Sequence, residues 1–479
     1  MTESGNLKQL AAKGLFWSAL ERFGAQGIQF IFGLMITRIL MPEDYGMVGM
    51  ILIFMAIGQT LVDSGFGASL IWKKEPSEID YSTVFYFNIA ISVFLYLIFF
   101  LIAPIIAGIY NEPHLTNLIR IICLNFIILS SSLIQQVILQ KHVNFKLLAY
   151  INIAGSFIAG VVSLYAALKN LGPWAIVLQI LVKSLFSSVL LWIFNKWRPL
   201  FVFSRLSLKN LFGYGSKLAA AGLIFTVFQY FYFNVIGKLF PLSSLGYYTR
   251  AVQLQEFPVR TISSIFSRVS FPVLSSIHED DERLKNAVGK TLRTLAFVIF
   301  PVMFGLISVA DPLIEVALTA KWLPASGFLK LLCIIGLFYP FQVIHYEIIK
   351  AKGKASWVLN MEIITKIVLI VNIIITYRWG ITAIIYGQIV TAIFTYGIGS
   401  TYVSNLINYS VWKQLKDIGI YLVLSAAMLL MVLAIQGFFS NRVLALISMI
   451  STGMILYLSL SWFLKLEEIK ELKKLFRFY

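Results

Sequence analysis

KGLFWSALERFGAQGIQFIFGLMITRIL (residues 13–40) and GYGSKLAAAGLIFTVFQYFYFNVIGKLF (residues 213–240) are two versions of one segment. The alignment continues into the turn that follows each segment, where Gly46 matches Gly246. Further matches follow downstream at slightly larger offsets: Cys123 with Cys333, and LGPWAI (171–176) with WGITAI (379–384). A long apolar chain built from two related halves is typical of transporters in which one half moves against the other.

The composition indicates a polytopic membrane protein. Apolar residues make up 59% of the 479 residues and charged residues 13%, whereas a soluble domain carries about 25% charged residues. The first apolar stretch is too long for a signal-peptide core and carries Glu21 and Arg22 in its middle, so we interpret it as a retained span. Both cysteines lie inside spans, and we expect them to be small buried side chains, with no disulfide framework, metal site or cofactor.

The hydropathy pattern predicts an all-α fold of about fourteen transmembrane helices of roughly 20 residues each, the length that a bilayer core requires. Their approximate limits are 13–40, 45–70, 83–106, 115–139, 147–168, 173–194, 213–240, 245–274, 292–312, 326–349, 356–377, 380–404, 417–437 and 443–464. Six spans precede the polar connection 195–212, and six more belong to the second repeat. Because six is even, both repeats enter the membrane in the same direction, which predicts two parallel lobes related by a pseudo-twofold axis.

This pattern gives a domain organisation. We expect an N-terminal lobe at 1–194, a cytoplasmic linker at 195–212 and a C-terminal lobe at 213–405. Two extra spans follow at 406–464, and a basic amphipathic cytoplasmic tail at 465–479, which we interpret as an interfacial helix.

The distribution of lysine and arginine predicts the orientation. With the N-terminus inside, roughly two thirds of the 39 basic residues lie at inner ends of spans and about a quarter at outer ends, as the positive-inside rule requires. Both termini are therefore predicted to be cytoplasmic. The net charge of +17 follows from this topology and from attraction to anionic membrane lipids, so we do not expect nucleic-acid binding.

Charged side chains inside spans are candidates for function, because each costs roughly 2.5–3.5 kcal/mol to insert at mid-bilayer. On span 245–274, three arginines fall within an arc of roughly 80° at 100° per residue. The predicted cationic, substrate-binding side chains are Arg22, Lys183, Arg250, Arg260 and Arg268. The predicted coupling or charge-pairing acids are Glu21, Asp63 and Glu256.

Structural alternatives stay open for several of these residues. Glu21 and Arg22 can form a buried pair, and Arg250 can anchor a span end in the headgroups. Glu362 and Lys366, at i and i+4, are expected to neutralise each other. His345 is expected to be packed or hydrogen-bonded instead of relaying protons, and the acidic cluster 278–282 to form a solvated loop before a helix.

An excess of arginine over acid in the spans predicts an anionic ligand. A guanidinium binds phosphate through two parallel hydrogen bonds and stays charged when it is desolvated. An exporter of lipophilic cations would instead need uncompensated carboxylates in its cavity. The residues therefore favour a substrate that carries phosphate or carboxylate groups.

At this point the chain resembles a known family, the polysaccharide (O-antigen and exopolysaccharide) flippases of the multidrug/oligosaccharidyl-lipid/polysaccharide exporter superfamily, above all their colanic-acid-type branch. The most specific string is LGYYTRAVQLQEFPVRTISSIFSRVSFPVLS at 245–275. Others are TRILMPEDYGMVGM (37–50), VDSGFGASLI (62–71), STVFYFN (82–88) and KWLPA (321–325). The resemblance covers about residues 8–405.

The resemblance implies a V of two six-helix lobes, often with two extra helices, in the bacterial inner membrane. It implies a non-enzymatic flippase that moves undecaprenyl-diphosphate-linked oligosaccharide to the outer leaflet by alternating access, for surface polysaccharide or lipopolysaccharide biosynthesis. By similarity, Arg22, Arg260 and Arg268 would line the central cavity. The energy source is not readable from the sequence: Glu21, Asp63 and Glu256 could carry H⁺ or bind Na⁺, and polysaccharide assembly proteins are candidate partners.

Three other functions remain as alternatives. A small-molecule or multidrug exporter shares the fold, but the excess of arginine over acid argues against it. A polysaccharide polymerase or ligase would need a sizeable outer loop with catalytic residues, and the predicted outer loops are short. A membrane scaffold would not need buried arginines.

Overall fold

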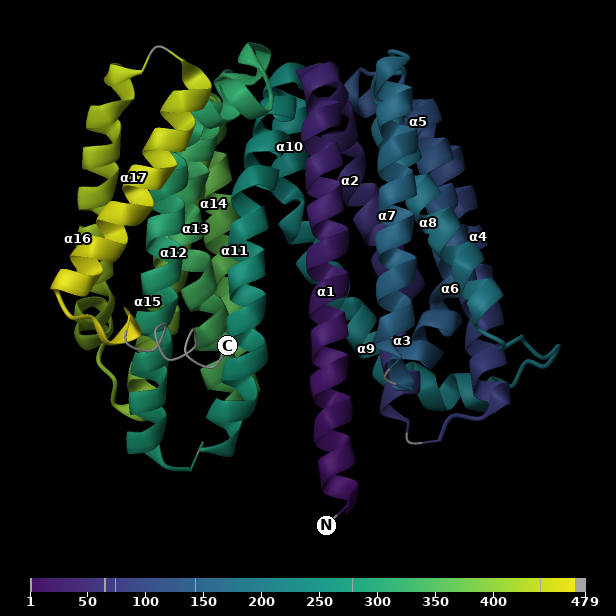
Figure 1. Cartoon of the computed structure of the whole chain (residues 1–479). Coiled ribbons are helices and arrows are strands. Elements are labelled where there is room, and N and C mark those ends of the chain that lie inside the picture. The colour runs from purple at the N-terminus through teal and green to yellow at the C-terminus, as the bar shows by residue number, and fades with distance from the viewer. Residues whose placement is uncertain are drawn as a thin grey trace. The chain divides into compact units, whose positions relative to one another are not determined.

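The computed structural model describes residues 2–63, 66–73, 75–142, 144–277, 279–439 and 441–469, and all regular secondary structure within these ranges is helical (Figure 1). The contacts group the chain into two compact units, Met1–Gly246 (unit 1) and Tyr247–Tyr479 (unit 2). The helices up to the boundary are α1 (Thr2–Ile39), α2 (Pro42–Asp63), α3 (Phe66–Trp72), α4 (Glu78–Tyr110), α5 (Leu115–Ile122), α6 (Leu124–Lys141), α7 (Phe145–Leu168), α8 (Trp174–Phe194), α9 (Arg205–Gln229) and α10 (Phe231–Leu239). Helix α11 (Leu242–Ser276) contains the boundary, and unit 2 continues with α12 (Asp281–Ala317), η1 (Ala320–Trp322), α13 (Pro324–Ala351), α14 (Ala355–Thr376), η2 (Tyr377–Trp379), α15 (Ile381–Ile407), α16 (Val411–Ile435), η3 (Gln436–Phe438) and α17 (Arg442–Phe463).

Eleven helical segments in the described part of the chain are long and apolar enough to cross a membrane. They correspond to eleven of the fourteen predicted spans. The other three predicted spans fall on α1, on α9 with α10, and on α11. Helix α1 has only a shorter apolar part at Phe23–Ile39, the span 213–240 is divided at Tyr230, and α11 carries several charged side chains. The total of fourteen spans therefore stays a prediction.

The helix pairings of unit 1 recur in unit 2. In unit 1, α4 packs on α6, α6 on α8, and α7 on α8. In unit 2, α12 packs on α13, α13 on α15, and α14 on α15. These are the same pairs of predicted spans in each repeat: third with fourth, fourth with sixth, and fifth with sixth. The shared pattern supports the duplication that the sequence indicates.

A reciprocal contact inside unit 1 joins the corresponding turns of the two repeats. A Cβ atom added at Gly46 would lie 2.2 Å from the carbonyl oxygen of Leu242, and one added at Gly246 would lie 1.8 Å from the carbonyl oxygen of Pro42. Pro42 and Leu242 are themselves equivalent in the repeat alignment. Two segments related by a twofold axis make this kind of contact, in which each touches the other through the same surface.

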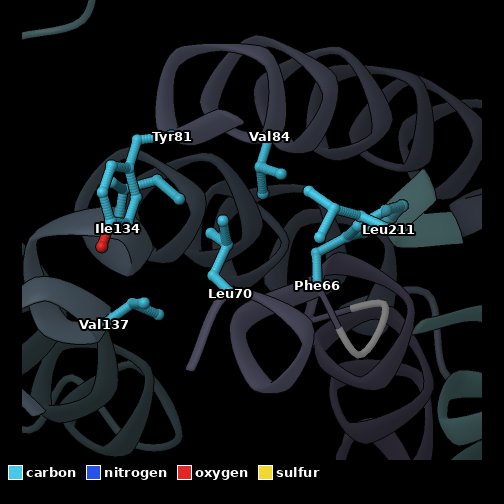
Figure 2. Close-up of a cluster of buried hydrophobic side chains, with 7 residues drawn as sticks. All are labelled: Phe66, Leu70, Tyr81, Val84, Ile134, Val137 and Leu211. Atoms are coloured by element: carbon cyan, nitrogen blue, oxygen red, sulfur yellow. The ribbon is translucent and has the colours of Figure 1, made fainter. Parts of the chain in front are cut away.

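Contacts place the start of the second repeat with unit 1, since α9 packs on α2 and α3. Near the start of α9, Leu211 joins a buried apolar cluster (Figure 2). Its other members are Phe66, Leu70, Tyr81, Val84, Ile134 and Val137. The lobe division at 195–212 remains a prediction alongside the contact boundary at Gly246.

The two C-terminal helices are part of unit 2, where α16 and α17 both pack on α12. Arg293 of α12 lies 3.8 Å from Asp417 of α16 and 3.9 Å from Glu468, which follows α17. The hydroxyl of Tyr409 donates to Asp417, and burial together with this carboxylate raises the pKa of the Tyr409 phenol. The predicted amphipathic tail is described only to Ile469; residues 470–479 lie outside the described part.

Candidate functional site

The predicted site residues lie on both units. Glu21, Arg22, Asp63 and Lys183 belong to unit 1, and Arg250, Glu256, Arg260 and Arg268 belong to unit 2. The side chains of Arg22 and Arg268 lie outside the described residues, so their predicted roles are not tested. Asp63, the last residue of α2, is exposed.

In unit 1, α7 contributes a partner for Glu21. The side-chain amide of Asn152 donates to Glu21 Oε1 at 2.6 Å, and Lys183 on α8 interacts electrostatically with Glu21. Helices α7 and α8 approach each other closely here, since a Cβ added at Gly155 would lie only 2.5 Å from the hydroxyl of Ser187. Small residues commonly allow such an approach between membrane helices. Glu21 thus has a hydrogen-bond partner on α7 and an electrostatic partner on α8.

In unit 2, the arginines of α11 have different surroundings. Arg250 is buried and donates from Nη1 to Gln253 Oε1 at 2.8 Å. Arg260 donates from Nε and Nη2 to the two carboxylate oxygens of Glu256, each at 2.8 Å. The Arg260 and Glu256 side chains are 45% and 39% exposed, so this fork is accessible to a ligand.

A second polar group joins α13 to α14. Tyr346 donates its hydroxyl to Glu362 at 2.7 Å and accepts from the amide of Gln342 at 2.8 Å. Lys366 lies 3.1 Å from Glu362, which confirms the predicted i, i+4 pair. Tyr339, on the same helix, interacts electrostatically with Glu256, Arg260 and Glu362.

These seven residues form one polar cluster on α11, α13 and α14, which we call the unit 2 polar cluster: Glu256, Arg260, Tyr339, Gln342, Tyr346, Glu362 and Lys366. Sequence reasoning missed Tyr339, Gln342 and Tyr346. Their spacing of three and four residues places them on one face of a helix, and that spacing was a signal that could have identified them.

The charge balance of this cluster differs from the net-cationic interior that the sequence predicts. Each of its two cations pairs with a carboxylate. A phosphate entering the cluster would have to replace a carboxylate, and the bidentate geometry of the Arg260 fork suits such an exchange. The phenol and amide groups can hydrogen-bond a polyhydroxylated ligand.

His345 of α13 is fully buried, with its ring centroid 5.4 Å from that of Tyr396, as expected for a packed residue. Cys123 and Cys333 are free and buried, which confirms their predicted role as small buried side chains. Among the residues that the structure describes, no three His, Cys, Asp or Glu side chains are placed to hold a metal ion.

Comparison with known proteins gives a family and a fold. Residues 35–327 match the family described as "Polysaccharide biosynthesis protein". The chain is 29% identical over 301 residues to the teichuronic acid biosynthesis protein TuaB of Bacillus subtilis (strain 168), covering 62% of each chain. It is 25% identical over 339 residues to the lipopolysaccharide biosynthesis protein WzxC of Escherichia coli (strain K12), covering 69% of this chain and 68% of WzxC. The match thus spans less than two thirds of the length of TuaB.

Among solved structures, the fold is similar to that of the lipid II flippase MurJ in an inward closed conformation. The TM-score is 0.77 at 16% identity, covering 94% of this chain and 99% of that one. At this identity the similarity concerns the fold alone.

Proposed function

We propose, because this chain belongs to the family of polysaccharide biosynthesis proteins, that it is a membrane flippase for lipid-linked oligosaccharide. The substrate class is undecaprenyl-diphosphate-linked repeat units, moved from the cytoplasmic to the outer leaflet of the bacterial inner membrane. The family match over residues 35–327 is the observation that carries this proposal. It is supported by the names of TuaB, a teichuronic acid biosynthesis protein, and WzxC, a lipopolysaccharide biosynthesis protein, and by the fold shared with a lipid II flippase.

In the proposed binding step, Arg260 exchanges Glu256 for the diphosphate. The guanidinium makes two hydrogen bonds before and after the exchange, because phosphate oxygens take the place of the carboxylate oxygens in the same fork, and the displaced Glu256 carboxylate, which is 39% exposed, is solvated instead. Tyr339 and Gln342 then face the first sugars, and the polyprenyl tail stays in the lipid. The exchange is reversible, so Glu256 can displace the headgroup at release.

Transport would proceed by alternating access, with the inner side closing before the outer side opens. The Glu21–Asn152–Lys183 group of unit 1 is the candidate for coupling to H⁺ or Na⁺. Its carboxylate accepts a hydrogen bond from α7 and interacts electrostatically with Lys183 of α8, so protonation or ion binding there would change the interactions between these helices. No catalytic step on the glycan is needed, and the protein acts as a transporter.

The experiment uses a strain in which the chain's gene is deleted. We expect loss of surface polysaccharide and accumulation of lipid-linked repeat units that an impermeant sugar oxidant cannot reach in spheroplasts. Expression of the full chain should restore both polysaccharide and accessibility. Accumulated units that are fully accessible from outside in the deletion strain would contradict the proposal, because the missing step would then follow flipping.

One observation favours a second candidate function, a small-molecule exporter. The described unit 2 polar cluster is charge-balanced, so the argument against a small-molecule exporter is weaker than the sequence indicates. The same deletion strain distinguishes the two functions. An exporter would change the accumulation of a cationic dye while leaving surface polysaccharide intact, and the flippase would do the reverse.

A further inference from the structure

The connection between α8 and α9 exposes large apolar side chains. We call residues 195–206 the strap; they comprise this connection and the first two residues of α9. Phe201 is 98% exposed and is the most exposed large apolar side chain in the described part of the molecule. Further exposed members are Leu200, Val202, Phe203 and Leu206. Such a patch on an irregular segment calls for a covering partner.

The strap is held in a fixed position on unit 1. The amide nitrogen of Leu200 donates to the buried hydroxyl of Ser82 at 2.9 Å, and that of Ser204 donates to the buried hydroxyl of Thr83 at 3.1 Å. The carbonyl oxygen of Trp197 accepts from the side chain of Gln135 at 3.1 Å. These bonds fix the backbone on both sides of Phe201, so its exposure is built into the fold.

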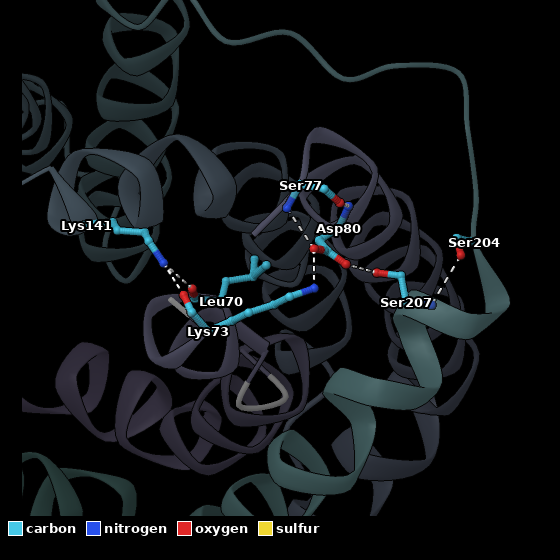
Figure 3. Close-up of polar contacts among 7 residues, drawn as sticks. All are labelled: Leu70, Lys73, Ser77, Asp80, Lys141, Ser204 and Ser207. Carbon is cyan, nitrogen blue, oxygen red and sulfur yellow. Dashed lines mark hydrogen bonds and ion pairs between the residues drawn. The ribbon is translucent and has the colours of Figure 1, made fainter. Parts of the chain in front are cut away.

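A buried carboxylate fixes the downstream end of the strap (Figure 3). Asp80 accepts from the hydroxyl of Ser207 in the first turn of α9, and also pairs with Lys73 at 2.6 Å. The Ser204 hydroxyl accepts from the amide of Ser207 at 3.2 Å, which caps α9. Helix α9 therefore begins at a defined point beside α4, with the strap leading into it.

The strap and the following turn are strongly basic. Lys196, Arg198, Arg205 and Lys209 are all exposed, and no acidic residue occurs between positions 195 and 212. Arg198 donates to the carbonyl oxygens of Trp192 and Asn195, so it also helps to shape the strap. Exposed aromatic residues interleaved with lysine and arginine are characteristic of segments that lie in the membrane interface.

The position of the strap agrees with this. It follows the C-terminal end of α8 and contacts the N-terminal end of α4, and both helices are long and apolar enough to span a membrane. The strap therefore lies where spans leave the hydrocarbon core. By the distribution of basic residues, this is the predicted cytoplasmic face.

We propose that the strap is an anionic-lipid binding site that anchors this end of unit 1 in the cytoplasmic leaflet. Phe201 and Phe203 insert among the upper acyl chains, and Lys196, Arg205 and Lys209 bind the headgroups of anionic phospholipids. The proposal depends on the membrane-spanning fold and is independent of the proposed transport function.

Depth measurement of a nitroxide label tests the insertion. The full-length protein carries the label on Phe201→Cys, in nanodiscs of phosphatidylcholine with phosphatidylglycerol, and Glu75→Cys is the control. Position 75 is exposed in the connection between α3 and α4. We expect the label at 201 to be reached by oxygen and protected several-fold from a water-soluble nickel chelate, relative to position 75. A label on Phe203→Cys gives a second measurement, should the variant at 201 not fold.

Lipid composition tests the charge part. Protection at 201 should increase when phosphatidylglycerol is added to phosphatidylcholine, and K196Q/R205Q/K209Q should lose this increase. Arg198 is left unchanged because it holds the strap. Labels at 201 and 203 that are as accessible to the nickel chelate as position 75 in both lipid mixtures would overturn the proposal, and a soluble protein would then be the partner to seek.

Discussion

At the scale of a residue, Arg260 shows how a predicted span can carry a charged side chain that still remains able to bind a ligand. Its pairing with Glu256, one turn away, does not depend on tertiary structure, because i, i+4 neighbours lie close together on any helix. The pair is 39–45% exposed, so it adds little to stability. The function of the residue should therefore be separable from folding.

We predict that Arg260→Ala abolishes polysaccharide export while the amount of protein in the membrane is unchanged. Arg260→Lys should restore export only in part, because an ammonium cannot make the bidentate contact. Arg268→Ala, which lies on the same predicted arc, should behave like Arg260→Ala. The measurement is surface polysaccharide in the deletion strain, with membrane protein quantified by immunoblot.

Arg283→Ala is the matched control, because the Arg283 side chain is highly exposed. Its ion pair with Asp280, at the start of α12, is long at 4.0 Å. Its export should equal that of the unchanged protein. Full export by both Arg260→Ala and Arg268→Ala would remove these arginines from the site, and loss of protein in place of export would give them a structural role.

A second residue-scale prediction concerns Tyr346. Replacing Tyr346 with Phe removes its hydrogen bonds to Glu362 and from Gln342, and it leaves the Lys366 pair in place. We expect a loss of roughly 1–3 kcal/mol in stability, because each of two typical hydrogen bonds contributes about 0.5–1.5 kcal/mol, and this loss should be seen as a lower Tm in detergent. Tyr386→Phe on exposed α15 surface should leave Tm unchanged, and an equal Tm for both variants would mean that the Tyr346 bond contributes nothing.

The site was predictable where partners share a helix. Glu362 with Lys366 follows from spacing alone, and the local partner Gln253 of Arg250 is also within one turn. Asn152 could not be assigned to Glu21 from the sequence, because the two residues come from different helices and only packing brings them together. The same holds for Tyr346, whose acceptor lies on α14.

At the scale of elements, the duplication produces an observation that can be tested. Gly46 and Gly246 occupy equivalent turns, and each lies against a backbone carbonyl of the other repeat. A backbone oxygen cannot rotate away as a side chain would. The contact between these two equivalent turns therefore depends on the absence of a Cβ atom at both positions.

We predict that Gly46→Ala and Gly246→Ala each destabilise the protein, by roughly 1–3 kcal/mol as for other overpacked contacts, and lower its Tm. The two effects should be similar because the contacts are reciprocal. Gly27→Ala is the control, since nothing lies within 4 Å of a Cβ there. In that helix interior, alanine should be neutral or stabilising by up to about 1 kcal/mol.

A Tm for Gly46→Ala as high as that of Gly27→Ala would mean that the turns are not in contact in the folded protein. The sequence alone could align these glycines, but it could not show that equivalent turns touch. Alignment concerns similarity along the chain, whereas the contact depends on where α2 and α11 begin in space.

The same limit explains the three predicted spans that fail the criteria of length and apolarity. Apolar periodicity identifies helices that lipid or other helices cover. Helix α11 instead carries Arg250, Glu256 and Arg260, and its overall apolarity is low for that reason. Helix α11, which carries Glu256 and Arg260 of the unit 2 polar cluster, is thus hard to recognise as a span because of those charges, whereas α13 and α14 of the same cluster are apolar enough to be recognised.

At the scale of the whole molecule, the sequence predicts the direction of the two repeats and the boundary between them. Six spans per repeat imply that corresponding helices of the two repeats run in the same direction. The recurrence of three helix pairings in each unit supports the duplication itself, and the shared direction stays a prediction. The contact boundary at Gly246 lies within α11, beyond the predicted linker, because α9 packs on α2 and α3.

The orientation in the membrane gives the last prediction. Cysteines placed at Asn111 and Asn441 should react with an impermeant maleimide added outside spheroplasts, and cysteines at His142 and Asp280 should not. All four positions are exposed at helix ends, and the native Cys123 and Cys333 are buried, so labelling reports on sidedness. After permeabilisation, all four should react.

Because α6 separates Asn111 from His142, these two must lie on opposite faces if the helix spans the membrane. Labelling at 142 and 280 alone would reverse the positive-inside assignment, and it would place the strap and its basic residues in the outer leaflet.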